Sequence, residues 1–217
     1  MTPLPEQMID RWEHRADQAH GQDTVYWHVL MRDHPEVIAL ARVAQKRLAD
    51  FPGLHMTPLE WLHMTTMVAG PAERFRPGQL DLMAKTAADM LAKVPPITVS
   101  LGRILYHPEA IMLGIEPAAA LAPVRTAAAT ATNLATGGHR PDGDLAKWIP
   151  HATVCYSTAH QPAAPLIAAL GENLPSCQAQ VNALSLVIQH GPERSWDWNT
   201  VATIHLGATT VTSGPTQ

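Results

Sequence analysis

Two short segments decide how this chain folds: residues 61–67, Trp-Leu-His-Met-Thr-Thr-Met, and residues 149–156, Ile-Pro-His-Ala-Thr-Val-Cys-Tyr. Each contains the pattern His-x-Thr within a short run that is typical of a strand. Because side chains alternate between the two faces of a strand, His63 and Thr65 share one face. The opposite face of that strand is expected to hold three apolar residues, Leu62, Met64 and Val68.

The second segment repeats this arrangement, with His151 and Thr153 on one face. Cys155 has the same parity, and we expect it to be a small packing residue, since no base is placed to activate it. Tyr156 has the parity of the core face, so packing with a bonded hydroxyl is favoured over a role in catalysis. We keep Tyr156 as a candidate substrate contact.

Composition limits the classes of function. A chain of 217 residues with 46% hydrophobic content can form one large domain or two lobes. The net charge of -4 and the pI near 6.3 argue against a surface for long duplex nucleic acid, so any nucleic-acid substrate is short or an end. Two isolated cysteines, Cys155 and Cys177, and the lack of a signal-like N-terminus predict a cytoplasmic protein with free thiols. No apolar run approaches the roughly 20 residues that span a bilayer, so we expect no membrane role.

The elements predicted along the chain form two similar halves, each ordered helix, strand, helix, strand, strand. The helices are expected at residues 35–49, 78–93, 117–135 and 163–170, and the strands at 24–31, 61–68, 97–104, 110–115, 149–157, 178–189 and 196–206. His151 follows His63 by 88 positions, and residue 180 follows residue 97 by 83. This repeated offset indicates an internal duplication, although alternating helices and strands are also common without one.

The domain prediction follows from these halves. Residues 1–22 are expected to be an N-terminal helical extension, with the helix at about 4–19. The first lobe is expected at about 23–116, with His63-Met64-Thr65, and the second at about 117–207, with His151-Ala152-Thr153. Residues 208–217 are expected to be a flexible tail.

The two His-x-Thr pairs carry the chemistry. Imidazole can give or take a proton near neutral pH, and a neighbouring hydroxyl can donate a hydrogen bond to a phosphate oxygen. Two such pairs supply what in-line cleavage of a phosphodiester needs: one base, one acid and two donors for the charged oxygens. This chemistry requires no metal and no cofactor.

Other residues have structural roles as alternatives. His55-Met56-Thr57 also fits His-x-Thr, but the adjacent Pro58 and Pro52-Gly53 indicate a loop, so we expect His55 to lie outside the site. His28 is a candidate substrate contact on a strand beside the site, with a buried sheet histidine as the alternative. Trp148, Trp196 and Trp198 are candidates for stacking on a base, with cover of a core edge as the alternative.

The motifs Trp-Leu-His-x-Thr and Pro-His-x-Thr-x-x-Tyr, placed centrally in two similar halves, resemble the two-histidine (2H) phosphoesterase superfamily and its 2′-5′ RNA ligase-like branch. The resemblance covers about residues 26–207. It implies an α+β, bilobal fold with antiparallel sheets around a central groove and helices outside. The groove would be lined by four residues: His63, Thr65, His151 and Thr153.

The resemblance also implies an activity. Members of this family act without a metal on cyclic phosphates or 2′,5′ linkages of RNA ends and small nucleotides. We therefore expect a monomeric phosphodiesterase whose substrate is a small nucleotide or an RNA end.

Two other classes of function compete with this interpretation. Twelve histidines would suit a metal-dependent hydrolase, but the sequence contains no His-Glu-x-x-His, no His-x-His and no Cys-His cluster at ligand spacing. A noncatalytic module that binds a nucleotide or RNA end on the same fold is the second alternative. Chelation would test the first, and substitution of His63 would test the second.

Overall fold

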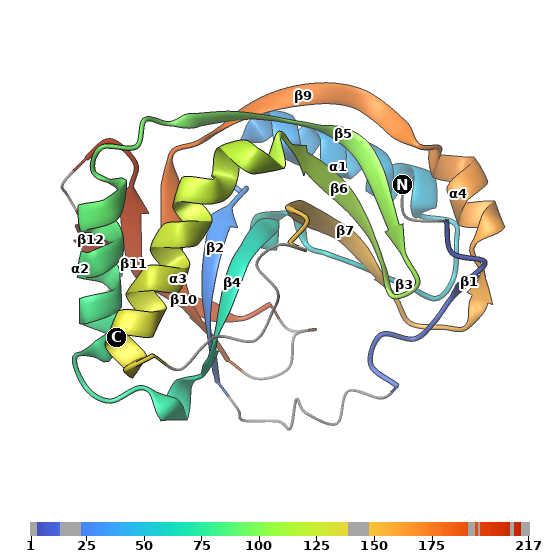
Figure 1. Cartoon of the computed structure of the whole chain (residues 1–217). Helices are drawn as coiled ribbons and strands as arrows, with labels where there is room; N and C mark the ends of the chain where they lie inside the picture. The colour runs from blue at the N-terminus through green and yellow to red at the C-terminus, as the bar shows by residue number, and fades with distance from the viewer. Residues whose placement is uncertain are drawn as a thin grey trace.

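The protein is described by a computed structural model for residues 4–13, 23–138, 148–190, 194, 196–208 and 211–213. Two five-stranded antiparallel sheets form its body (Figure 1). The sheet that contains His63, here the His63 sheet, has the order β12 (Val211–Ser213), β11 (Trp198–His205), β10 (Ala183–Gln189), β2 (Thr24–Leu30) and β4 (His63–Pro71). The His151 sheet has the order β3 (Leu54–Met56), β7 (His151–Ser157), β6 (Ala110–Glu116), β5 (Ile97–His107) and β9 (Asn173–Val181).

Four α-helices pack on these sheets. They are α1 (Pro35–Leu48), α2 (Gln79–Leu91), α3 (Ala122–Thr136) and α4 (Ala164–Leu170), with short 3-10 turns at Leu59–Trp61, Ala72–Arg74 and Ala118–Leu121. Helices α2 and α3 contact each other and the His63 sheet, while α1 and α4 contact each other and α1 contacts the His151 sheet. The helices agree with the predicted ranges to within a few residues at each end, and α3 ends where Gly137 adopts a left-handed conformation with φ of 71°. The α+β fold class predicted from the sequence is confirmed.

The two sheets are interleaved along the chain. Strands β10, β11 and β12 come from the C-terminal half but join β2 and β4, whereas β5 and β6 come from the N-terminal half and join β7. The expected lobe boundaries, 23–116 and 117–207, therefore do not coincide with the sheets. The hairpin of β5 and β6 continues pairing onto β7, where Gly114 lies opposite His151, and this pairing draws it into the other sheet.

The strand predicted at 178–189 is wrong as a single strand. The chain leaves regular structure at Asn182, so that β9 pairs with β5 in the His151 sheet and β10 pairs with β2 in the His63 sheet. Residues 97 and 180, which the duplication would place in opposite lobes, thus belong to strands that pair with each other. The physical reason is that the run of strand-forming residues continues on both sides of Asn182. The part before Asn182 pairs in one sheet, and the part after it pairs in the other.

The ends of the chain also differ from prediction. Over residues 4–13 the structure shows no helix: Gln7–Met8 form β1, which pairs with β8 (Gln161–Pro162), and residues 14–22 lie outside the described residues. Met8 is fully buried, so a core contact overrides the helical pattern. Within the expected tail, Val211–Ser213 pair with β11 and extend the His63 sheet.

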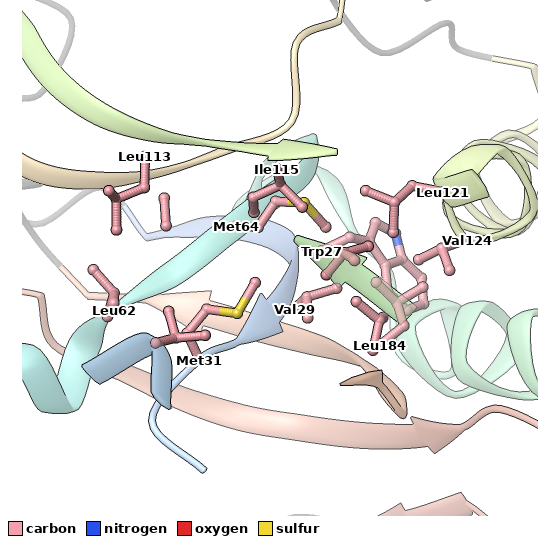
Figure 2. Packing of buried hydrophobic residues seen from close by; sticks show 14 of the residues in the cluster. Trp27, Val29, Met31, Leu62, Met64, Leu113, Ile115, Leu121, Val124 and Leu184 are labelled. Atoms are coloured by element: carbon pink, nitrogen blue, oxygen red, sulfur yellow. The ribbon is translucent and has the colours of Figure 1, made fainter. Parts of the chain in front are cut away.

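One hydrophobic core joins the two sheets. Side chains of β2 and β4 meet side chains of β6, α3 and β10 in a single buried cluster (Figure 2). Trp27 lies among Leu121, Val124 and Leu184, and its indole N–H donates to Thr132 Oγ1 at 3.0 Å. Because both sheets pack into the same cluster, the strands that carry the His-x-Thr motifs are held in a fixed relation.

Among the described residues, no helix has the length and apolar character needed to cross a membrane.

Trp27→Ala should lower the free energy of unfolding by about 3–5 kcal/mol, because it opens a cavity in this shared core and leaves the Thr132 hydroxyl without its donor. Val43→Ala, on the outer face of α1 with 42% exposure, should change it by no more than about 0.5 kcal/mol. Urea denaturation of both variants tests this. Equal losses for the two would contradict a core that spans both sheets.

Candidate functional site

The structure brings His63, Thr65, His151 and Thr153 to one cavity of about 230 Å³. His63 and Thr65 come from β4, and His151 and Thr153 come from β7. These strands belong to different sheets but contact each other where the sheets meet. The cavity therefore presents two imidazoles and two hydroxyls from opposite sides.

Both imidazoles are fixed by the same local hydrogen bond. His63 Nδ1 lies 2.7 Å from the carbonyl oxygen of Trp61, and His151 Nδ1 lies 2.7 Å from that of Ile149. A carbonyl can only accept, so Nδ1 carries the proton and donates it in both rings. Proton exchange with a ligand therefore falls to Nε2, which accepts a proton when the ring is neutral and donates one when it is charged.

A one-residue bulge follows each motif and reverses the side-chain parity beyond it. In β4, Thr65 pairs with His28 and Met67 with Trp27, so Thr66 is the extra residue. In β7, Thr153 pairs with Met112 and Cys155 with Ile111, so Val154 is the extra residue. The two bulges are 88 positions apart, as the two histidines are.

These bulges change the side-chain directions that strict alternation predicts for three residues. Val68 was expected on the core face, but it is 42% exposed and lines the cavity. Tyr156 is buried as expected, at 6% exposure, but it belongs to a second cluster with Val187 and Trp196 and lines the cavity. Cys155 shares the strand parity of His151, but it is fully buried in the main core as a packing residue. Strict alternation fails at a bulge, because two residues oppose one on the partner strand.

The bulge in β7 is supported from outside the sheet. The carbonyl of Val154 accepts hydrogen bonds from the Thr57 N–H at 3.0 Å and from Gln45 Nε2 at 3.1 Å. Gln45 of α1 also donates to the carbonyl of Thr57 at 2.6 Å. The carbonyl of the extra residue therefore has two donors, which stabilises the parity change.

The environment of His151 favours its neutral form. Burial lowers the pKa of His151 from the usual 6.5, and the charges of Arg11 and His107 lower it further, while the hydrogen bond to Ile149 opposes this decrease. In the absence of a ligand, His151 is therefore mostly neutral at pH 7.

His63 lies against an aromatic wall. Its ring centroid is 4.2 Å from that of His28 and 5.0 Å from that of Trp198. His28 lines the cavity but is 1% exposed, and burial together with the neighbouring His63 holds its pKa well below 6.5. At neutral pH, His28 therefore supplies a neutral ring that packs beside His63.

A larger cavity of about 780 Å³ adjoins the first and shares Arg11, His151, Thr153 and Tyr156 with it. It extends along the His151 sheet and is also lined by Trp148. The Trp148 indole N–H donates to the carbonyl of Thr65 at 3.2 Å, and the Arg125 guanidinium lies 4.7 Å from the Trp148 ring centroid. Trp148 is thus both a cavity wall and a tie between the two motif strands.

His55 lies on β3 rather than in the expected loop, opposite Tyr156. Its ring stacks on Trp196 at 4.9 Å and meets Trp12 edge-on at 5.5 Å, and it is not among the described residues that line either cavity. Trp196 does line the smaller cavity and has an unusual positive φ of 42°, which is backbone strain held in place by this packing.

Three residues that line the smaller cavity were not anticipated, Arg11, Tyr26 and Gln189, whereas Trp196 was a candidate for stacking on a base. Tyr26 is two residues before His28 on the same strand, so strand alternation would have indicated it. Arg11 and Gln189 come from distant segments and have no local signal in the sequence.

Among the described residues, no three His, Cys, Asp or Glu side chains lie together in a way that could hold a metal ion. Cys155 and Cys177 are free thiols.

The chain has two antiparallel sheets, and each contributes one strand that carries a His-x-Thr motif. This arrangement is the LigT-like fold of the two-histidine phosphoesterases. The sequence matches the 2′-5′ RNA ligase superfamily over residues 34–193, and the chain belongs to this superfamily. No curated protein matches the chain.

Solved structures agree on the fold. TT0787 of Thermus thermophilus is 19% identical with a TM-score of 0.62, covering 85% of this chain and 98% of that one. LigT of E. coli, solved with 3′-AMP, is 12% identical with a TM-score of 0.61, covering 86% of this chain and 98% of that one. LigT solved with ATP is 13% identical with a TM-score of 0.59, covering 85% and 98%.

The corrected position of Cys155 predicts its reactivity. Burial raises its pKa to about 12, so in the folded Cys177→Ser variant a thiol reagent should label almost nothing, whereas the Cys155→Ser variant should be labelled at the half-buried Cys177. Denaturation should release one thiol in each variant. Rapid labelling of folded Cys177→Ser would show that Cys155 faces the cavity after all.

Proposed function

We propose that the protein is a metal-independent phosphoesterase that acts on a cyclic phosphate or 2′,5′-phosphodiester of a nucleotide or RNA end. The observation that carries this proposal is the matched pair of histidines, each with Nδ1 bonded to a carbonyl two residues earlier and each lining the same cavity. One imidazole acts as the general base and the other as the general acid, and neither proton transfer uses a metal ion.

The reaction follows from the atoms in the cavity. The Nε2 of a neutral histidine takes a proton from the attacking water, whose oxygen forms a new bond to phosphorus. The bond from phosphorus to the leaving ribose oxygen breaks, and the Nε2–H of the second, charged histidine protonates that oxygen. Hydroxyls of Thr65 and Thr153 donate to the nonbridging oxygens, where negative charge increases.

We assign the base to His151. A base must be neutral to accept a proton, and burial together with Arg11 and His107 lowers the pKa of His151 and favours that form. His63 then acts as the acid. In the reverse direction of ligation the two histidines exchange roles, because each has gained or lost the proton it needs.

The size of the two cavities supports a nucleotide as substrate. The smaller cavity suits the phosphate between the two histidines, and the adjoining volume of about 780 Å³ falls within the usual range for pockets that bind small organic ligands. Trp148 and Tyr106 offer flat rings there on which a base can stack. LigT, which shares this fold, has been solved with 3′-AMP, ATP and NADP+.

His63→Ala and His151→Ala should each lower the turnover of a 2′,3′-cyclic nucleotide by about 10²- to 10⁴-fold, because each removes one proton transfer. The double variant should be little worse than the poorer single one, since the two residues act as a unit. Thr65→Ala and Thr153→Ala should lower turnover by a smaller factor, because each removes one neutral donor.

Steady-state kinetics measures these effects, with His55→Ala as the matched control. Near wild-type turnover in both single histidine variants would remove the proposal, and so would activity that chelation abolishes and a divalent metal restores.

The pH dependence of kcat/KM should be bell-shaped. The base limb rises as pH increases through the pKa of His151, and because that pKa is lowered, the limb should lie below pH 6.5. Comparing the pH profiles of kcat/KM for His151→Ala and His63→Ala shows which histidine is responsible for each limb. If His63→Ala loses the acidic limb while His151→Ala keeps it, the assignment of base and acid is reversed.

A further inference from the structure

The N-terminal segment 4–13, here called the strap, borders the larger cavity at Leu4 and Arg11 and is held by backbone hydrogen bonds. The Ala163 N–H donates to the carbonyl of Glu6 at 3.0 Å, β1 pairs with β8, and the Ile9 N–H donates to Pro108 at 2.9 Å. The Arg11 N–H donates to the carbonyl of Ser157 at 3.0 Å. The match to the superfamily begins at residue 34, so this strap lies outside it.

The strap places Arg11 beside the two histidines. Arg11 lines both cavities, and its guanidinium carbon lies 4.4 Å from the ring centroid of Tyr156. Its Nη1 donates to Glu109 Oε2 at 3.0 Å, and its side chain is only 15% exposed. Glu109 and Tyr156 thus hold the guanidinium in one orientation, which reduces the entropy lost when it binds an anion.

Charge makes this position significant. Among the described residues that line the smaller cavity, Arg11 is the only lysine or arginine. A phosphodiester carries a full negative charge that His63 and His151 cannot both neutralise, because one of them must be neutral to act as a base. A guanidinium is permanently charged and matches the geometry of phosphate oxygens.

We propose that Arg11 is a phosphate-binding residue of the groove, which the N-terminal strap carries into the site and which Glu109 and Tyr156 orient toward the substrate. This inference rests on the proposed function for the identity of the substrate, but the binding of phosphate itself can be measured without turnover. If Arg11 binds phosphate, the strap contributes directly to substrate binding.

A structural role for Arg11 would be to anchor the strap through Glu109, so the experiment must separate anchoring from binding. Arg11→Gln removes the charge and the ion pair, whereas Glu109→Gln removes the ion pair and leaves the charge of Arg11. Arg42→Gln makes the same charge change on an exposed face of α1. Arg11→Lys keeps the charge but loses the planar fork.

The first measurement is the affinity of each folded variant for inorganic phosphate, by calorimetry. Arg11→Gln should weaken binding by about 10- to 100-fold, the usual effect of removing a charged hydrogen-bond partner. Arg11→Lys should recover part of this loss, Arg42→Gln should match wild type, and Glu109→Gln should bind phosphate at least as tightly as wild type. An unchanged affinity in Arg11→Gln would overturn the proposal, as would an equal loss in Glu109→Gln.

The second measurement is the pKa of His151 in the ligand-free protein, followed by NMR of its ring. His151 faces Arg11 of the strap and His107 of β5, and it shares the larger cavity with Glu109, Arg103 and Glu172. Loss of the Arg11 charge should raise the pKa of His151, whereas Glu109→Gln should lower it and Arg42→Gln should leave it unchanged. A pKa that does not move in Arg11→Gln would show that Arg11 is too far from the site to bind the same phosphate.

These readouts separate the two proposals. If the wild-type protein binds phosphate through Arg11 but turns over no cyclic nucleotide or 2′-5′ linked oligonucleotide, the proposed function fails and the role of Arg11 stands. If cyclic nucleotides are hydrolysed and Arg11→Gln raises neither KM nor the phosphate dissociation constant, the role of Arg11 fails and the proposed function stands.

Discussion

The hydrogen bond from each histidine Nδ1 to the carbonyl two residues earlier is the constraint on which the site depends. It occurs at 2.7 Å in both motifs, at His63 with Trp61 and at His151 with Ile149. The bond fixes the tautomer and the ring orientation with backbone atoms that are close in sequence, so neither ring needs a partner side chain for this. Both rings can therefore have the same geometry while their surroundings differ.

Those surroundings differ between the two rings. His63 packs against the neutral ring of His28 and the ring of Trp198, whereas His151 is buried and lies near the positive charge of Arg11. A positive neighbour favours the neutral form of a histidine. Burial and the charge of Arg11, which comes from another element, thus favour the neutral form of His151.

The bulges at Thr66 and Val154 show how much depends on a single residue in a strand. Without them, Tyr156 would point to the core and Cys155 to the groove, as strict alternation predicts. With them, Tyr156 becomes the surface on which Arg11 stacks, and Cys155 becomes part of the core. Gln45 and Thr57 donate hydrogen bonds to the carbonyl of Val154, so the site in β7 also depends on α1 and on the chain after β3.

The sequence by itself determined the helices α1 to α4, most strands and the equivalence of the two His-x-Thr pairs, because periodicity and side-chain chemistry are local properties. It also determined which side chains are able to exchange protons and donate to phosphate. Only the tertiary structure decided that the sheets are interleaved, that the parity changes after each motif, and that Arg11 and Trp196 reach the cavity. These features depend on which strands pair and on where a bulge forms. Pairing between distant strands and a one-residue slip leave no local pattern in the sequence, since their free energies come from packing between segments far apart in the chain.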